Sequence, residues 1–194
     1  MTGELGYSLP PAVRRIANSF RLVGWISFWS QTVLAVISSM VLIFASATLG
    51  ARAANTGGGN PGTGAGLGLA GLGLLTIYIG AFWAWSYTRL GRKLRTSNPD
   101  LRPKPKDAAQ KIRIGIIISL VGMLLTLLGT QAIVGSLLGK SVSSQAAGFI
   151  NPGALSQFVQ PVDIFVVQAA TNILLAHFIG MCASLWLSRA VNRQ

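Results

Sequence analysis

The single histidine of this 194-residue chain, His177, lies in a long apolar stretch and is the residue best suited to chemistry there. A neutral imidazole can ligate a haem or chlorophyll, relay a proton, or hydrogen bond to a carbonyl or amide on a neighbouring helix. The residues around it show no pigment-binding framework, and Gly180 and Ser184 follow on its side at helical spacing. We expect a structural hydrogen bond and no cofactor, with tetrapyrrole ligation and a proton relay as the alternatives.

Four side-chain amides also lie in apolar stretches, where polar groups are functional candidates by default. They are Gln31, Gln131, Gln168 and Asn172. Such groups commonly hydrogen bond between membrane helices and contribute about 0.6 kcal/mol each. At about 100° per residue, Gln168 and Asn172 lie about 40° apart, whereas His177 lies about 180° from Gln168. No single polar stripe forms, which favours local helix packing over a transport path.

The sequence contains no arrangement typical of an enzyme, such as paired carboxylates, a Ser/His/Asp set or metal-ligand spacing. Cys182 is the one cysteine, so neither an internal disulfide nor a cysteine metal cluster can form. The segment Gly66 to Gly71 matches the letters of a dinucleotide fingerprint but lacks the strand before it and an acid near Ser86. Asp163 is expected in the first turn of a helix, where a carboxylate caps free amides.

Four apolar segments hold these residues, and among their residues only Arg113, at the start of the third segment, is a charged side chain. Each reaches the ~20 residues that a helix needs to cross about 30 Å of hydrocarbon. Only 10% of the residues are charged, against about 25% in soluble proteins. The predicted fold is an all-α integral membrane four-helix bundle, a membrane domain over 22–188 between a terminal segment 1–21 and a tail 189–194. The predicted spans are 22–49, 67–87, 112–138 and 164–187.

The basic residues alternate between the two sides of this predicted bundle. Of 16 Lys and Arg, three precede the first span, nine lie from Arg89 to Arg113 at the connection of the second and third, and two follow the fourth. Only Arg52 and Lys140 fall in the other two connections. The positive-inside rule then predicts that both termini are cytoplasmic. The net charge of +12 is expected to meet anionic lipid headgroups on that side, and not nucleic acid.

Residues before the first span are expected to form a short amphipathic helix in the plane of the membrane interface. Ser8 can cap it, and apolar positions such as Ile16 and Phe20 recur opposite Arg14 and Arg15. Aromatic residues at the inner ends of the spans are expected to mark the headgroup boundary. They are Trp25, Phe28, Trp29, Phe82, Trp83, Trp85, Tyr87 and Trp186.

Glycine has two predicted roles. The glycine-rich segment Thr56 to Gly73 is interpreted as a flexible outer loop that runs into the second span. Elsewhere, pairs of small residues four positions apart predict close helix approach. These pairs are Gly64/Gly68, Gly80/Ala84, Gly135/Gly139 and Gly180/Ser184.

Three stretches resemble one known family: Trp83–Leu94, Leu120–Leu138 and Val166–Gly180. They are similar to the cyanobacterial and plastid membrane proteins grouped as domain of unknown function 3611, and the resemblance extends from about Phe20 to Leu187. It implies four spans and a cyanobacterial thylakoid or plasma membrane, or a chloroplast membrane. It implies no activity and supplies no functional residues.

These observations favour a non-enzymatic membrane protein, an assembly or accessory component of a thylakoid-type complex. Its expected partners are the lipid bilayer and other membrane proteins or further copies of itself. A small-solute or ion transporter is the alternative. The candidate packing residues are Gln31, Gln131, Gln168, Asn172, Gly80 and Gly180.

Overall fold

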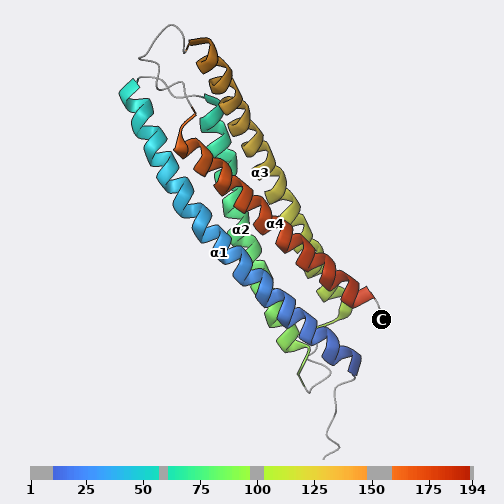
Figure 1. Ribbon diagram of the computed structural model, residues 1–194. Helices are drawn as coiled ribbons and strands as arrows, with labels where there is room; N and C mark the ends of the chain where they lie inside the picture. Colours follow the sequence, from blue (N-terminus) through green and yellow to red (C-terminus); the bar gives the residue numbers. More distant parts are fainter. Residues whose placement is uncertain (1–10, 57–60, 97–102, 148–158, 193–194) are drawn as a thin grey trace, which may run out of the picture.

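The computed structural model describes residues 11–56, 61–96, 103–147 and 159–192, and these contain four long α-helices (Figure 1). All four are long and apolar enough to cross a membrane. Because lipid offers the backbone no hydrogen-bond partners, a helix that satisfies its own amides is the structure such segments adopt. The predicted all-helical membrane bundle is confirmed. Its helices are α1 Pro11–Thr56, α2 Pro61–Lys93, α3 Pro105–Ala147 and α4 Pro161–Asn192.

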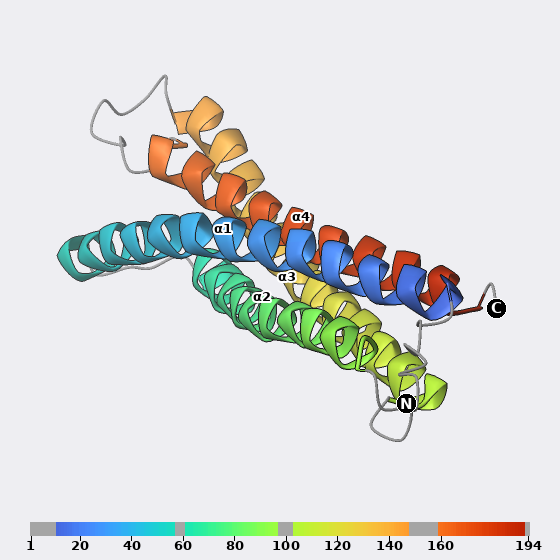
Figure 2. The ribbon, with the colours of Figure 1, turned by 90° about the horizontal axis from the view of Figure 1, so that it is seen from below.

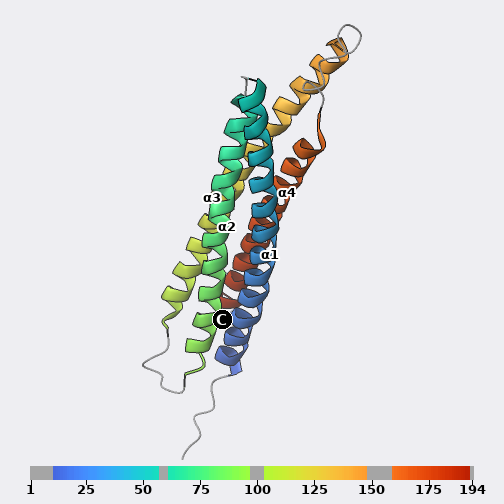
Figure 3. The ribbon, with the colours of Figure 1, turned by 90° about the vertical axis from the view of Figure 1, so that its left-hand side faces the viewer.

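The helices form an elongated bundle in which each packs against its neighbours in the chain, and α4 returns to pack against α1. In addition, α2 contacts α4 across the bundle. Figure 1 shows the start of α1 and the end of α4 at the same end, together with the end of α2 and the start of α3. At the opposite end α1 and α3 diverge (Figures 2 and 3).

Two apolar cores lie along the bundle axis. One surrounds Phe20, Leu90, Ile112 and Leu187, near the end that holds both termini. The other, which includes Ile133, occupies the half toward the opposite end. On every helix, small or polar side chains lie between the two cores, and together they form what we call the polar layer: Ser27, Gln31, Gly80, Gly115, Ser119, His177, Gly180 and Ser184.

The expected separate amphipathic helix is not observed, because α1 runs without a break from Pro11 into the first span. The apolar positions of its first turns pack against α2 instead of facing lipid. Ala17 and Phe20 are buried, and a Cβ at Gly91 would lie 2.8 Å from the Ala17 carbonyl oxygen. Burial against α2 therefore keeps this segment in line with the bundle, while Ser8 lies outside the described residues.

The interpretation of Thr56–Gly73 as a loop was wrong for most of its length, since α2 begins at Pro61. Two of its glycines make the contact with α3. A Cβ on Gly66 would lie 2.9 Å from the Gly129 carbonyl oxygen, and one on Gly73 would clash with Thr126. Glycine here permits close helix approach, which outweighs its low helix propensity.

Among the interfacial aromatics, Tyr87 departs from the expectation. Trp25, Trp29 and Trp186 are exposed on the bundle surface, as a lipid-headgroup belt requires. Tyr87 is only 2% exposed and packs edge-on against Phe20. It is a core residue, because its hydroxyl finds partners on α3 and α4.

Candidate functional site

The polar layer centres on Gln31, which is 2% exposed in the middle of α1. Its Nε2 donates a hydrogen bond to Ser27 Oγ at 2.7 Å. A Cβ on Gly80 would lie 2.7 Å from Gln31 Oε1, and one on Gly180 would lie 3.1 Å from its Nε2. The structure thus brings together three of the predicted packing residues, and the two glycines make room for the amide.

A small cavity of about 10 Å³ adjoins this amide. Its lining is mostly small and polar: Ser27, Gln31, Gly80, Trp83, Ala84, Tyr87, Gly115, Ser119, Gly180 and Ser184. A space of this size accommodates about one water molecule. It is therefore a pocket within the packing and not a wet path through the bilayer.

His177 lies one turn from Gly180 and is 1% exposed. Its Nε2 lies 3.1 Å from the Gly73 carbonyl oxygen and 3.1 Å from Thr76 Oγ1, both on α2. A carbonyl can only accept, so Nε2 carries the proton and is engaged. In this tautomer Nε2 cannot ligate the metal of a tetrapyrrole. That the protein binds no cofactor stays a prediction.

The imidazole ring fits because the facing position on α3 is Gly122, where a Cβ would clash with the ring. Sequence reasoning missed Gly122, Gly73 and Thr76. The spacing of Gly73 and Thr76 on α2 offered no signal, since the contact joins residues 104 positions apart.

A second polar contact closes the layer toward the end that holds both termini. Tyr87 Oη and Ser184 Oγ lie 3.1 Å apart, and Ser184 donates to the Gly180 carbonyl oxygen at 3.0 Å. Trp83 Nε1 donates to the Lys111 carbonyl oxygen at 2.9 Å. Ser184 was expected only as a small packing residue, whereas its hydroxyl also binds Tyr87.

The remaining predicted amides lie elsewhere. Gln131 is exposed on α3. Gln168 is exposed on α4 and its Nε2 donates to Asn172 Oδ1 at 3.2 Å, within the same helix. The expected bonds between helices are thus not made by these residues. The helical arithmetic that separated His177 from Gln168 agrees with the structure, since one is buried and the other exposed.

Of the predicted small-residue pairs, two do not pack within the bundle. Gly64, Gly68, Gly135 and Gly139 have no atom within 4 Å of a built Cβ. Close approach is instead made by glycines that the four-residue spacing did not identify, because the spacing does not say which face of a helix is buried. They are Gly24, Gly66, Gly73, Gly91, Gly115, Gly122 and Gly129.

Asp163 accepts a hydrogen bond from the Gln160 backbone amide at 3.0 Å, one half of a capping box at the start of α4. This agrees with the predicted cap. The carboxylate also pairs with Lys140 at 3.2 Å, which joins the ends of α3 and α4. Over the described ranges, no three His, Cys, Asp or Glu side chains gather as a metal site would require.

The helices and their interior define a multi-pass integral membrane protein with a polar layer inside the bundle. The chain belongs to the family described as "Protein of unknown function (DUF3611)", whose model matches residues 10–192. It is 33% identical over 184 residues to "Protein TIC 21, chloroplastic" of Arabidopsis thaliana. That alignment covers 92% of this chain and 58% of the relative, so the chain spans little more than half of that protein's length. No solved structure matches.

Proposed function

We propose that this protein is a non-enzymatic subunit that assembles with a membrane protein through the outer face of α4. The observation that carries the proposal is the amide pair Gln168 and Asn172, together with Thr171 beside it. Gln168 and Thr171 are exposed on the bundle surface. The named chloroplast relative supports a chloroplast membrane or its cyanobacterial counterpart as the site of assembly.

The depth of this amide pair is important, because polar groups at the headgroups need no protein partner. Asn172 precedes Arg189, the basic residue at the far end of α4, by 17 residues, or about 26 Å along the helix. It follows Asp163 by nine residues, or about 14 Å. The pair therefore lies within the hydrocarbon, toward the end of the bundle that carries Asp163.

Each side-chain amide has two donor hydrogens and a carbonyl oxygen, and the bond between Gln168 and Asn172 uses one donor and one acceptor. The other groups face lipid on the isolated chain, where an unsatisfied polar group costs several kcal/mol. A partner helix that supplies hydrogen bonds would remove this cost. The energy gained favours assembly through α4.

The interior supports this assignment over a transporter. Buried side-chain N and O atoms bond to other side chains or to the backbone, and among the described residues Ser86 Oγ is the one without a partner. The cavity beside Gln31 holds about one water. A closed interior and a pair of amides on the outer face of α4 suit a subunit, whereas a transporter needs a path.

Crosslinking in native membranes tests the proposal. The unmodified chain should give a defined crosslinked complex, and the double variant Gln168→Leu with Asn172→Leu should reduce its yield at least severalfold. Leu175→Ile is the matched control, because Leu175 is exposed on the same helix and carries no polar group. The result contradicts the proposal if the complex is equally abundant in both variants.

Reconstituted liposomes provide a second test, which addresses the transporter alternative. Vesicles with the protein should be as tight to protons and small ions as empty vesicles. A saturable flux that the same double variant abolishes, together with no crosslinked complex, would establish the transporter alternative. Identifying the crosslinked chain by mass spectrometry distinguishes a second copy from a different protein.

A further inference from the structure

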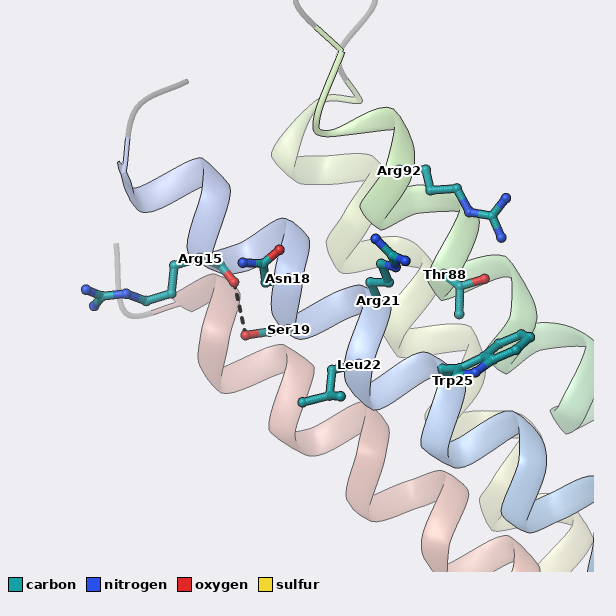
Figure 4. Close-up of a pocket in the computed structure, with 8 residues that line it drawn as sticks. All are labelled: Arg15, Asn18, Ser19, Arg21, Leu22, Trp25, Thr88 and Arg92. Carbon is teal, nitrogen blue, oxygen red and sulfur yellow. Dashed lines mark hydrogen bonds between the residues drawn. The ribbon is translucent and has the colours of Figure 1, made fainter. Parts of the chain in front are cut away.

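A groove of about 850 Å³ lies at the end of the bundle that carries both termini, over the first turns of α1 and the last turns of α2 (Figure 4). Its volume is in the range of ligand sites, about 300–1,000 Å³. It is lined by Arg15, Asn18, Ser19, Arg21, Leu22, Trp25, Thr88 and Arg92. Neither the polar layer nor the outer face of α4 contributes to it.

The groove is strongly cationic and carries no carboxylate. Arg15, Arg21 and Arg92 are exposed on its walls. Among the residues that the structure describes, the acids are Asp107 and Asp163. The first caps α3 by accepting from the Lys104 amide, and the second pairs with Lys140. No described acidic side chain therefore neutralises the arginines of the groove.

Close packing of α1 on α2 sets the positions of these arginines. A Cβ on Gly24 would lie 3.1 Å from the Ala84 carbonyl oxygen, and one on Gly91 would lie 3.1 Å from the Arg21 backbone nitrogen. Figure 4 shows Arg21 extending beside Thr88 and Arg92 on the adjoining turn of α2, whereas Arg15 points away from them. Arg21 on α1 and Arg92 on α2 thus bring guanidinium groups from two helices to the groove, and Figure 4 shows their ends pointing apart.

Asn18 adds a neutral donor one turn before Arg21 on α1. Its Oδ1 accepts a hydrogen bond from Arg95 at 2.6 Å, which leaves the Nδ2 hydrogens to donate. Thr88 contributes no donor, because its hydroxyl already donates to the Trp85 carbonyl oxygen at 2.7 Å. Donors and positive charge without a carboxylate are the chemistry that recognises a phosphate.

The remaining walls are apolar and exposed. Leu22 is 64% exposed and Trp25 is 46% exposed. Trp25 lies about one turn deeper in α1 than Arg21 and stacks on Phe28 with the ring centroids 5.6 Å apart. A ligand that fills the groove therefore has a negatively charged head beside Arg21 and Arg92 and an apolar part along Leu22 and Trp25.

We propose that this groove binds the phosphate headgroup of an anionic phospholipid from the adjacent leaflet. Arg21, Arg92 and Asn18 hold the phosphate oxygens, and the first part of an acyl chain lies against Leu22 and Trp25. Free phosphate has the same headgroup chemistry but would not use the apolar walls. The site is independent of the assembly surface on α4.

Native mass spectrometry of the full chain in a neutral detergent tests the proposal, with phosphatidylglycerol and phosphatidylcholine as the added lipids. Phosphatidylglycerol should bind at least about tenfold more tightly, because each nearby cation contributes roughly fivefold. Arg21→Gln with Arg92→Gln should remove this preference. Arg113→Gln with Arg189→Gln is the control, since it removes the same charge from exposed positions on α3 and α4. This control variant should keep the preference for phosphatidylglycerol.

Two further comparisons separate the possible sources of the phosphate. Leu22→Gln should weaken phosphatidylglycerol binding without changing the helical circular dichroism, since Leu22 is mostly exposed. Inorganic phosphate at equal concentration should not displace the lipid. Displacement by inorganic phosphate would overturn the lipid assignment. If both double arginine variants lost the preference for phosphatidylglycerol equally, diffuse charge attraction would explain the binding and no defined site would be needed.

Discussion

The imidazole of His177 donates a hydrogen bond to the backbone carbonyl oxygen of Gly73. This oxygen has two lone pairs, and the bond within α2 uses only one of them. The bond ties α4 to α2 across the bundle, as the contact of Tyr87 with Ser184 also does. Thr76 Oγ1 reaches the same carbonyl at 2.6 Å. The carbonyl oxygen is therefore within hydrogen-bond distance of two side chains, one from α2 and one from α4.

Replacing His177 with Leu should lower the free energy of unfolding by about 1–3 kcal/mol, because a buried hydrogen-bonded group is lost and its partner is left in an apolar setting. Thermal unfolding in detergent measures the effect. His177→Asn should retain the fold with a smaller loss. The purified protein should show no visible absorption band, and a stoichiometric tetrapyrrole band that His177→Asn abolishes would contradict a purely structural role.

Replacing Gly180 or Gly80 with Leu should destabilise the bundle by about 1–3 kcal/mol, since both positions face the Gln31 amide and the core has no room. Gly135→Leu is the matched control because nothing lies within 4 Å of its built Cβ. Unfolding temperatures in detergent should fall for the first two variants only. Equal temperatures for Gly180→Leu and the control would show that Gln31 is not confined as described.

Breaking the ion pair of Lys140 and Asp163 should loosen the junction of α3 and α4. Lys140→Met leaves a 2% exposed carboxylate without its cation, and we expect a loss of about 1–3 kcal/mol. The double variant with Asp163→Asn should recover part of this loss, since no buried charge remains. A double-mutant cycle by thermal unfolding measures the coupling, and strict additivity would rule it out.

The orientation of the chain is testable by cysteine labelling on a Cys182→Ser background. Arg95 and Val142 are exposed at opposite ends of the bundle. From the positive-inside rule, we expect Arg95→Cys to be labelled only from the cytoplasmic or equivalent side, and Val142→Cys only from the other. Labelling of both positions from one side would refute the predicted topology.

Hydrophobic length alone predicted the four helices and the membrane class, because an apolar segment of about 20 residues has no other stable form in lipid. The apolar lengths did not predict where the helices end. The amphipathic pattern predicted a helix before residue 22, but it did not predict that Phe20 packs this segment against α2. The helix over 61–66 was not predicted at all, and it packs against α3 where Gly66 meets Gly129. Such contacts join distant residues and leave no local pattern.

The sequence identified Gln31, Gly80, Gly180 and His177 as notable residues because polar and very small side chains are unusual at these depths. Only the tertiary structure decided that Gln31 meets both glycines, and that His177 bonds α2. It also decided that Gln168 and Gln131 face outward. A helix period gives the angle between residues on one helix, but the rotation of each helix about its own axis is set by packing of all four.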